Sequence, residues 1–150
     1  MSPADVLARL RRFLLLFAAL MLAGALAELW LTNHTENFTQ LIPFFLCGLA
    51  LVALLAALVR PRAGVLWALR ACAVLLLGGS FYGVYEHFIN NVGFQREIDP
   101  TTPDSAVLTA AVGGPNPLLA PGILAAAALL ALAATYYHPA LDRAGDEPHD

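Results

Sequence analysis

Long apolar runs, separated by short polar segments, dominate the chain. Each of four runs has about the 20 residues that an α-helix needs to cross a bilayer. Leu and Ala fill these runs, without the alternation of apolar and polar residues that is typical of membrane β-strands. The pattern therefore predicts an all-α fold, an integral membrane bundle of four helices. The predicted helices are Phe13–Leu31, Leu41–Val59, Val65–Phe88 and Leu118–Tyr137.

The segments between the runs predict how the helices are connected. Thr32–Gln40 and Arg60–Gly64 are short, so the first three helices are expected to pack antiparallel to their neighbours. Residues 89–117 form a much longer outer loop. Within it, Thr102-Pro103 and Gly113-Gly114 are signals that begin and end a short helix. The whole chain is interpreted as one transmembrane domain.

Composition supports the same class of protein. Hydrophobic residues make up 59% of the 150 residues and charged residues only 13%, whereas soluble domains have roughly 25% charged residues. A soluble chain this apolar would expose large hydrophobic patches, so the lipid bilayer is the first predicted partner. A cleaved signal peptide is the alternative for the first run, because "RLRR" precedes it and "AGALAEL" contains small residues where a peptidase cuts.

The arginines predict the orientation in the membrane. All eight basic residues are arginines, and with this topology only Arg96 falls on the outer side. The positive-inside rule therefore places both termini, the turn at 60–64 and the polar tail 139–150 in the cytoplasm. Many Ala and Arg residues without any Lys are typical of GC-rich bacterial genomes, so we expect a bacterial inner membrane. No basic patch with aromatic residues occurs, so nucleic acid is not an expected partner.

Acidic, His and Asn side chains gather at the outer ends of the first and third helices. The third helix ends in "GSFYGVYEHFINN", where polar groups replace apolar ones as the helix leaves the bilayer. A carboxylate inside a spanning helix, such as Glu28, is a functional candidate because lipid does not solvate it. One turn from the helix end, however, Glu28 can also reach water or pair with Arg96. The predicted outer cluster comprises Glu28, His34, Glu36, Gln40, Glu86, His87, Asn90, Asn91 and Glu97.

A divalent metal is one candidate cofactor for this cluster. Two imidazoles with two or three carboxylates form a ligand set that zinc, iron or manganese sites use. The candidate ligands are His34, Glu36, Glu86, His87 and Glu97. Adjacent Glu86 and His87 point about 100° apart on a helix, so both reach one ion only if the helix frays there. The structural alternative is that these side chains cap helices and bond loop backbone. An enzymatic alternative uses His87 as general base beside Glu86.

Gly79 and Gly83 share one face of the third helix with His87 and Asn91, because the four recur every four residues. Small residues at this GxxxG spacing let another helix approach closely. The glycine face is expected to pack against the first or fourth helix of the chain, or against a second protein. Either arrangement would carry His87 into a packed seam rather than into lipid.

Three segments, "HTENFTQLIP", "GVYEHFINNVGFQRE" and "PNPLLAPG", together resemble a family of small bacterial four-helix membrane proteins of unassigned function. The resemblance covers about residues 13–139 and implies a fold and a location but no reaction. The positions that it implies to recur are His34, Glu36, Gln40, Pro43, His87, Asn91, Glu97 and the Pro121-Gly122 pair.

Common catalytic motifs are missing from the sequence: no Walker loop, dinucleotide fingerprint, HExxH or serine-centred elbow occurs. The predicted function is therefore a non-enzymatic accessory or scaffold component with an outward-facing acidic and His cluster. It would dock to a partner membrane protein or to a second copy through its glycine face and outer loop. The alternatives are a protein that binds a divalent metal for metal handling or redox chemistry, and a small membrane enzyme.

Overall fold

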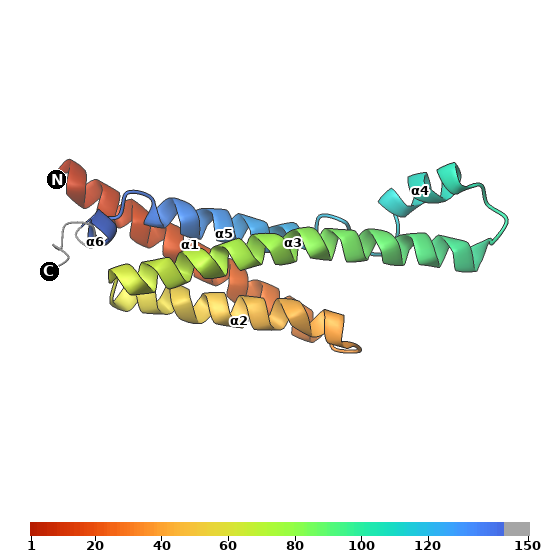
Figure 1. Ribbon diagram of the computed structural model, residues 1–150, viewed down its shortest axis with the longest axis horizontal. Coiled ribbons are helices and arrows are strands. Elements are labelled where there is room, and N and C mark those ends of the chain that lie inside the picture. Colours follow the sequence, from red (N-terminus) through yellow and green to blue (C-terminus); the bar gives the residue numbers. More distant parts are fainter. Residues whose placement is uncertain (143–150) are drawn as a thin grey trace, which may run out of the picture.

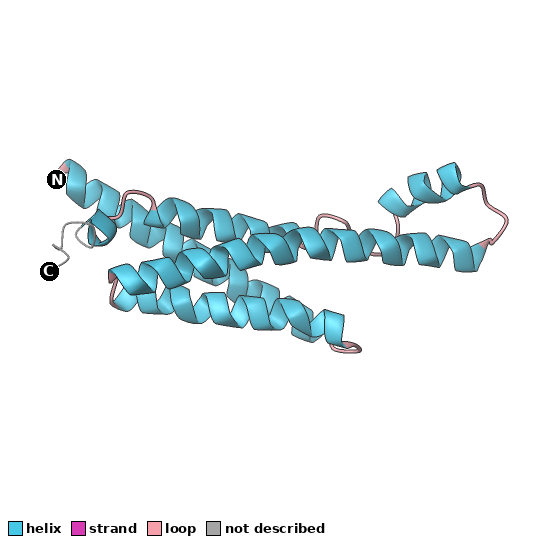
Figure 2. Ribbon diagram, in the orientation of Figure 1, coloured by secondary structure: helices cyan, strands magenta, loops and turns pink. Residues whose placement is uncertain are grey.

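The computed structural model describes residues 1–142, and this part of the chain contains helices and loops only (Figures 1 and 2). The predicted all-α class is thereby confirmed. Residues 143–150 of the predicted tail lie outside the described residues. In chain order the helices are α1 (Pro3–Leu31), α2 (Phe38–Val59), α3 (Ala63–Ile98), α4 (Asp104–Val112), α5 (Gly122–Thr135) and α6 (Pro139–Asp142).

Three of these helices, α1, α2 and α3, are long and apolar enough to cross a membrane. The fourth apolar run forms the shorter α5, with 14 residues. It was expected to start at Leu118, but the stretch before Gly122 is a turn that contains Pro117 and Pro121. Proline disfavours helical backbone at the residue before it and lacks an N–H, so Pro117 and Pro121 disfavour an earlier start of this helix.

Local capping explains where the first two helices begin. At the start of α1, the Ser2 hydroxyl accepts from the Asp5 N–H and the Asp5 carboxylate accepts from the Ser2 N–H, at 3.2 and 3.0 Å. This reciprocal capping box starts α1 ten residues before its apolar run. Asn37 caps α2, its Oδ1 accepting from the Gln40 N–H at 3.0 Å. Because α2 begins at Phe38, Pro43 lies inside the helix rather than in its first turn.

The four apolar helices pack around a core of Leu and Ala side chains. α5 contacts α1 and α3, and α2 contacts the same two helices from the other side (Figure 1). Small residues such as Ala18, Ala50 and Ala128 are almost completely buried where the helices approach. Large apolar residues such as Phe13 and Phe45 instead remain exposed. Outward-facing apolar side chains on spanning helices are suited to contact with a lipid bilayer.

The two ends of the molecule differ in shape. At one end, called the arginine end, the N-terminus, the α2–α3 turn and α6 lie together (Figure 1). At the other, called the open end, the α1–α2 turn diverges from α3. α3 runs ten residues past Phe88, so the predicted outer loop begins as helix. α4 folds back against this extension through its buried Val107 and Ala111. Residues 89–112 are called the arm below.

Two arginines close the end of α5 at the arginine end. Arg70 donates from Nε to the Thr135 hydroxyl at 3.1 Å and from Nη2 to the Thr135 carbonyl at 2.8 Å. Its guanidinium also lies 4.8 Å from the centre of the Trp67 ring. Arg11 donates from Nη2 to the carbonyl of Tyr137 at 2.7 Å. These donors satisfy carbonyls that a helix terminus leaves without an intrahelical partner.

The glycine face packs inside the chain. A Cβ added at Gly79 would overlap the Leu46 side chain of α2, and one added at Gly83 would lie 2.9 Å from Cβ of Pro121. Gly83 therefore meets Pro121, the residue that precedes α5. Gly79 meets the second helix, which was not expected. Both glycines therefore have close neighbours within the same chain.

Replacing Gly83 with Ala is expected to destabilise the fold. The rigid Pro121 ring cannot move away easily, and overpacking of this kind costs about 1–3 kcal/mol. Gly93→Ala is the matched control on the same helix, because nothing lies within 4 Å of a Cβ added there. Thermal unfolding in detergent should show a lower Tm for Gly83→Ala only. Equal Tm values for both variants would contradict the close approach at Gly83.

Candidate functional site

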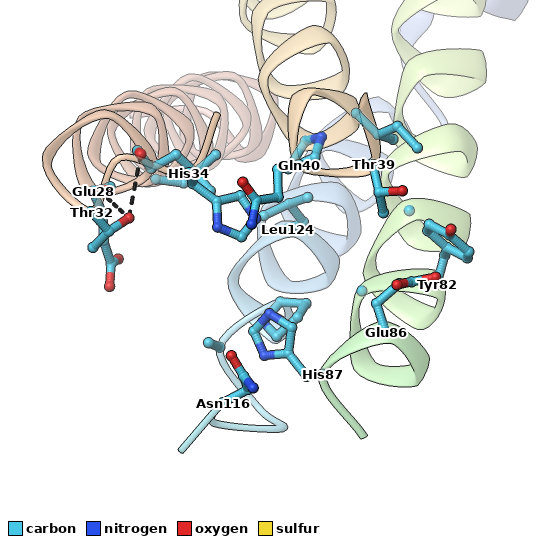
Figure 3. Close-up of a pocket in the computed structure, with 18 of the residues that line it drawn as sticks. Glu28, Thr32, His34, Thr39, Gln40, Tyr82, Glu86, His87, Asn116 and Leu124 are labelled. Carbon is cyan, nitrogen blue, oxygen red and sulfur yellow. Dashed lines mark hydrogen bonds between the residues drawn. The ribbon is translucent and has the colours of Figure 1, made fainter. Parts of the chain in front are cut away.

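A pocket of about 590 Å³ opens at the open end, between the α1–α2 turn on one side and α3 with the loop before α5 on the other (Figure 3). Its volume lies in the range of small-molecule sites, about 300–1,000 Å³. Apolar residues from the bundle, including Ala25, Leu46 and Leu124, form part of its lining. The polar lining residues are Glu28, Thr32, His34, Asn37, Thr39, Gln40, Tyr82, Glu86, His87, Asn90 and Asn116.

The end of α1 determines where His34 lies. Asn33 has φ of 52°, in the left-handed region that Asn tolerates better than most residues. The Asn33 N–H bonds to the Trp30 carbonyl at 3.2 Å, and the His34 N–H bonds to the Leu29 carbonyl at 3.0 Å. This pair of bonds is the Schellman motif that ends many helices. It turns the chain so that His34 lines the pocket (Figure 3).

His87 lies on the wall of the pocket opposite His34, where the loop before α5 holds it. Its Nδ1 lies 2.8 Å from the Pro117 carbonyl oxygen. A carbonyl only accepts hydrogen bonds, so Nδ1 carries the proton and Nε2 keeps its lone pair in the neutral ring. The partner that orients His87 is thus a loop carbonyl rather than Glu86, which the enzymatic alternative had placed beside it.

The pKa of His34 lies below its ordinary value. Partial burial is the largest cause, the nearby His87 lowers the pKa further, and Glu36 opposes both by raising it. The neutral form of His34 is therefore favoured. Because its folded pKa is below its unfolded pKa, the unfolded chain binds more protons between the two values. Deprotonated His34 therefore stabilises the fold above about pH 6.5. This stabilisation is lost as the pH falls from the pKa of the unfolded chain towards that of the folded chain.

The carboxylates do not converge on the two histidines. Glu86 and Glu28 both line the pocket, and Glu86 lies beside Tyr82 (Figure 3). Glu36 and Glu97 are exposed and outside the pocket lining. Among residues 1–142, no three His, Cys, Asp or Glu side chains form a group able to hold a metal ion. The structure thus brings three of the five candidate ligands to one pocket but does not arrange them as a ligand set.

Gln40, predicted as part of the polar cluster, has a structural role as well. Its Oε1 accepts from the Glu36 N–H at 2.7 Å, which ties the α1–α2 turn to the first turn of α2. Pro43 lies in the second turn of the same helix. It lacks the N–H that would bond to the Thr39 carbonyl, and Thr39 and Pro43 both line the pocket.

Asn91 is completely buried and ties the loop to α3. Its Nδ2 donates to the carbonyls of Ala111 and Asn116, each at 2.9 Å. Its Oδ1 accepts from the Asn116 N–H at 2.9 Å and from Asn116 Nδ2 at 3.0 Å. A Cβ added at Gly114 would lie 2.7 Å from this Oδ1. All four hydrogen-bonding positions of the amide are therefore used for structure, and Asn91 does not line the pocket.

The sequence did not predict the hydrogen bond that Ser80 makes to the loop before α5. Its hydroxyl donates to the Pro121 carbonyl at 2.8 Å, and its side chain is buried. The signal available in the sequence was a small polar residue within the glycine-rich part of α3. Asn116 and Pro117 were likewise not singled out, although both lie in the quoted "PNPLLAPG" segment.

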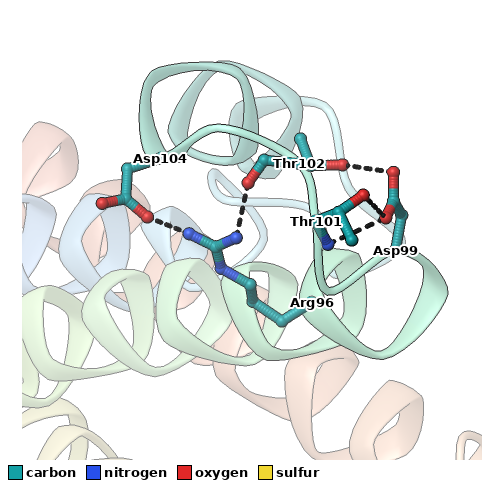
Figure 4. A network of polar contacts seen from close by, with 5 residues as sticks. All are labelled: Arg96, Asp99, Thr101, Thr102 and Asp104. Atoms are coloured by element: carbon teal, nitrogen blue, oxygen red, sulfur yellow. Dashed lines mark hydrogen bonds and ion pairs between the residues drawn. The ribbon is translucent and has the colours of Figure 1, made fainter.

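The turn between α3 and α4 contains a separate polar network (Figure 4). Arg96 forms an ion pair with Asp104 and donates from Nη1 to the Thr102 carbonyl at 2.5 Å. Arg96 therefore pairs within the arm rather than with Glu28. Asp99 accepts from the Thr101 hydroxyl at 2.6 Å, and from the Thr101 N–H and the Thr102 hydroxyl. These bonds, the Thr101 hydroxyl first, hold the pKa of Asp99 below its ordinary value.

Asn91→Ala is expected to release the loop from α3. The variant leaves the partly buried N–H and carbonyl of Asn116 without partners, at about 1–3 kcal/mol each, whereas the Ala111 carbonyl keeps the Gly114 N–H at 3.4 Å. Asn90→Ala is the control, because Asn90 is exposed one position away. Hydrogen exchange followed by mass spectrometry should show faster exchange over residues 111–117 in Asn91→Ala only. Unchanged exchange there would mean that the amide does not hold the loop.

No protein-family model matches the chain, and no curated protein or solved structure matches it either. The resemblance to small bacterial four-helix membrane proteins stays an expectation from the sequence. The side chains of the pocket are therefore the basis on which a function can be assigned.

Proposed function

We propose that the chain is an inner-membrane protein of a bacterium, with four spanning helices and its open end in the periplasm. Three helices of spanning length support this proposal, as does the packing of the apolar α5 between α1 and α3. The distribution of charge supports the orientation, because six arginines lie towards the arginine end and Arg96 lies in the arm. α5 is short for a span, and the turn at 118–121 extends it towards the open end.

Site-specific labelling tests this orientation. In a chain whose buried Cys47 and Cys72 are replaced with Ala, we expect Thr101→Cys to react with a membrane-impermeant maleimide added to spheroplasts. Arg62→Cys should react only after the membrane is opened, because the α2–α3 turn would face the cytoplasm. The reverse pattern would invert the topology, and labelling of both positions from outside would contradict it.

The function that we propose is a non-enzymatic accessory protein whose outer pocket binds a small cationic ligand with an apolar part. The main support for this proposal is the composition of the pocket lining. Glu28 and Glu86 are present, and none of the lining residues is Lys or Arg. The lowered pKa of His34 disfavours a positive charge on its ring. Carboxylates near an apolar surface favour a ligand that brings positive charge and hydrophobic area together.

The hydrogen bond of His87 supports a binding role. Its Nδ1 bonds to the Pro117 carbonyl, and Glu86 lies beside Tyr82, so the two residues do not form the pair of the enzymatic alternative. The bond fixes the imidazole in the pocket wall and leaves Nε2 as an acceptor for a ligand. As an accessory protein, the chain would meet a membrane partner or a second copy through its arm, where Phe94 and Leu108 are exposed.

A divalent metal is the second candidate ligand, because two imidazoles line the same pocket. His87 keeps the lone pair of Nε2, and its Nδ1 bond to a carbonyl is the kind of second-shell contact that orients metal-bound histidines. Zinc, iron or manganese would then take two protein nitrogens, with water or another ligand at the remaining positions. Glu36 and Glu97 would not take part, because they lie outside the pocket lining.

Calorimetry with a matched pair of probes tests the cationic ligand. Tetraphenylphosphonium and tetraphenylborate have nearly the same shape and opposite charge, and we expect the purified protein to bind the cation at least tenfold more tightly. Glu28→Gln and Glu86→Gln should each weaken cation binding about tenfold, or about 1.4 kcal/mol. Glu97→Gln, in the arm, should have no effect. Equal affinity for both probes would contradict the proposal.

The same preparations distinguish the metal. Protein purified without chelators is analysed for metal by mass spectrometry, alongside His34→Ala and His87→Ala. If the protein contains stoichiometric metal and both variants lose it, the ligand of the pocket is a metal and not an organic cation. Metal-free protein that binds tetraphenylphosphonium would support the proposed ligand class.

A further inference from the structure

A second cavity lies at the arginine end and takes no part in the outer pocket. Its volume is about 320 Å³, and its walls come from α1, α2, the α2–α3 turn, α3, α5 and the start of α6. Leu15, Leu58 and Leu66 contribute apolar surface to it, and Arg11, Arg12 and His138 contribute polar groups. The cavity therefore offers hydrogen-bond donors beside a hydrocarbon-like wall.

Arg11 is held in place by the backbone and has a donor to spare. Its Nη2 donates to the carbonyls of Tyr136 and Tyr137, which fixes the guanidinium beside the end of α5. Its Nε is buried and has no hydrogen-bond partner within the described residues. Arg carries five N–H donors in one plane, so a second acceptor can bind while the carbonyls stay bonded.

The charge at this end favours an anion as that acceptor. Arg9, Arg11, Arg12, Arg60, Arg62 and Arg70 all lie towards it, and the only carboxylate there among residues 1–141 is Asp5. Asp5 belongs to the capping box of α1 and does not line the cavity. His138 accepts the Ala140 N–H through Nδ1 at 3.1 Å, so this ring helps to shape the α5–α6 turn.

We propose that this cavity binds the phosphate group of an anionic phospholipid. Arg11 and Arg12 would contact the phosphate, and the leucine side chains would contact the glycerol and the first methylene groups. Basic pockets between membrane helices at the level of the headgroups bind phospholipids in this way. A soluble phosphate compound shares the anionic chemistry but has no use for the apolar wall. The proposal does not depend on what the outer pocket binds.

Native mass spectrometry in a non-ionic detergent tests the site with defined probes. We expect the full chain to retain one phosphatidylglycerol with an affinity at least fivefold higher than for phosphatidylcholine. Inorganic phosphate at 10 mM should leave the bound lipid in place. Arg12→Gln should weaken phosphatidylglycerol binding about fivefold, whereas Arg9→Gln should leave it unchanged, because Arg9 lies one turn away and outside the cavity lining.

Arg12 is the residue to change first because it is exposed and makes no hydrogen bond that holds α5, unlike Arg11. Circular dichroism should show that both variants remain folded. Equal retention of the two lipids would overturn the proposal, and so would equal losses in Arg9→Gln and Arg12→Gln, which would indicate diffuse attraction. Displacement of the lipid by inorganic phosphate would assign the site to a soluble phosphate and overturn the assignment to phospholipid.

Discussion

Backbone carbonyls that lie outside regular helix need hydrogen-bond donors, and a bilayer offers none in its hydrocarbon region. In this protein the backbone is irregular on either side of the short helix α5. Side chains of α1 and α3 supply the donors. Ser80, His87 and Asn91 serve the loop before α5, and Arg70 and Arg11 serve the chain after it. The position of α5, and with it the shape of both cavities, depends on these bonds.

This division of labour limits what each polar residue is free to do. Asn91 uses all of its hydrogen-bonding capacity on the loop, so it shapes the outer pocket without lining it. His87 bonds to the Pro117 carbonyl through Nδ1, which leaves Nε2 for a ligand. Arg11 likewise spends one amino group on the end of α5. A side chain that is half committed to structure gains a fixed position, which is what a binding residue needs.

Much of this architecture could be predicted from the pattern of apolar residues, because a helix that crosses a bilayer needs an apolar run of about 20 residues. The helical class and the location of three spanning helices followed from it. The extension of α3 did not, since residues 89–98 are too polar to belong to a run and are helical because α4 packs on them. Ser2 extends α1 for a similar reason: a cap is a local signal that hydropathy does not register.

The candidate site was predictable in outline only. Helical periodicity predicts that Gly79, Gly83, His87 and Asn91 share one face, but it cannot say which helix faces them. Gly79 meets α2, and the loop before α5 takes up Asn91 and one nitrogen of His87. The residues of the loop itself gave no periodic signal. A metal ligand set drawn from the sequence therefore included Glu36 and Glu97, which lie outside the pocket lining.

The length of α3 has a consequence for where the protein acts. With 36 residues, the helix is about 54 Å long at 1.5 Å per residue. A bilayer with its headgroups is only about 40–45 Å thick. A helix that starts at one surface thus rises roughly 10 Å above the other, and α4 braces the part that emerges. In a bilayer the arm would raise its polar turn clear of the lipids, within reach of molecules dissolved in the water on that side.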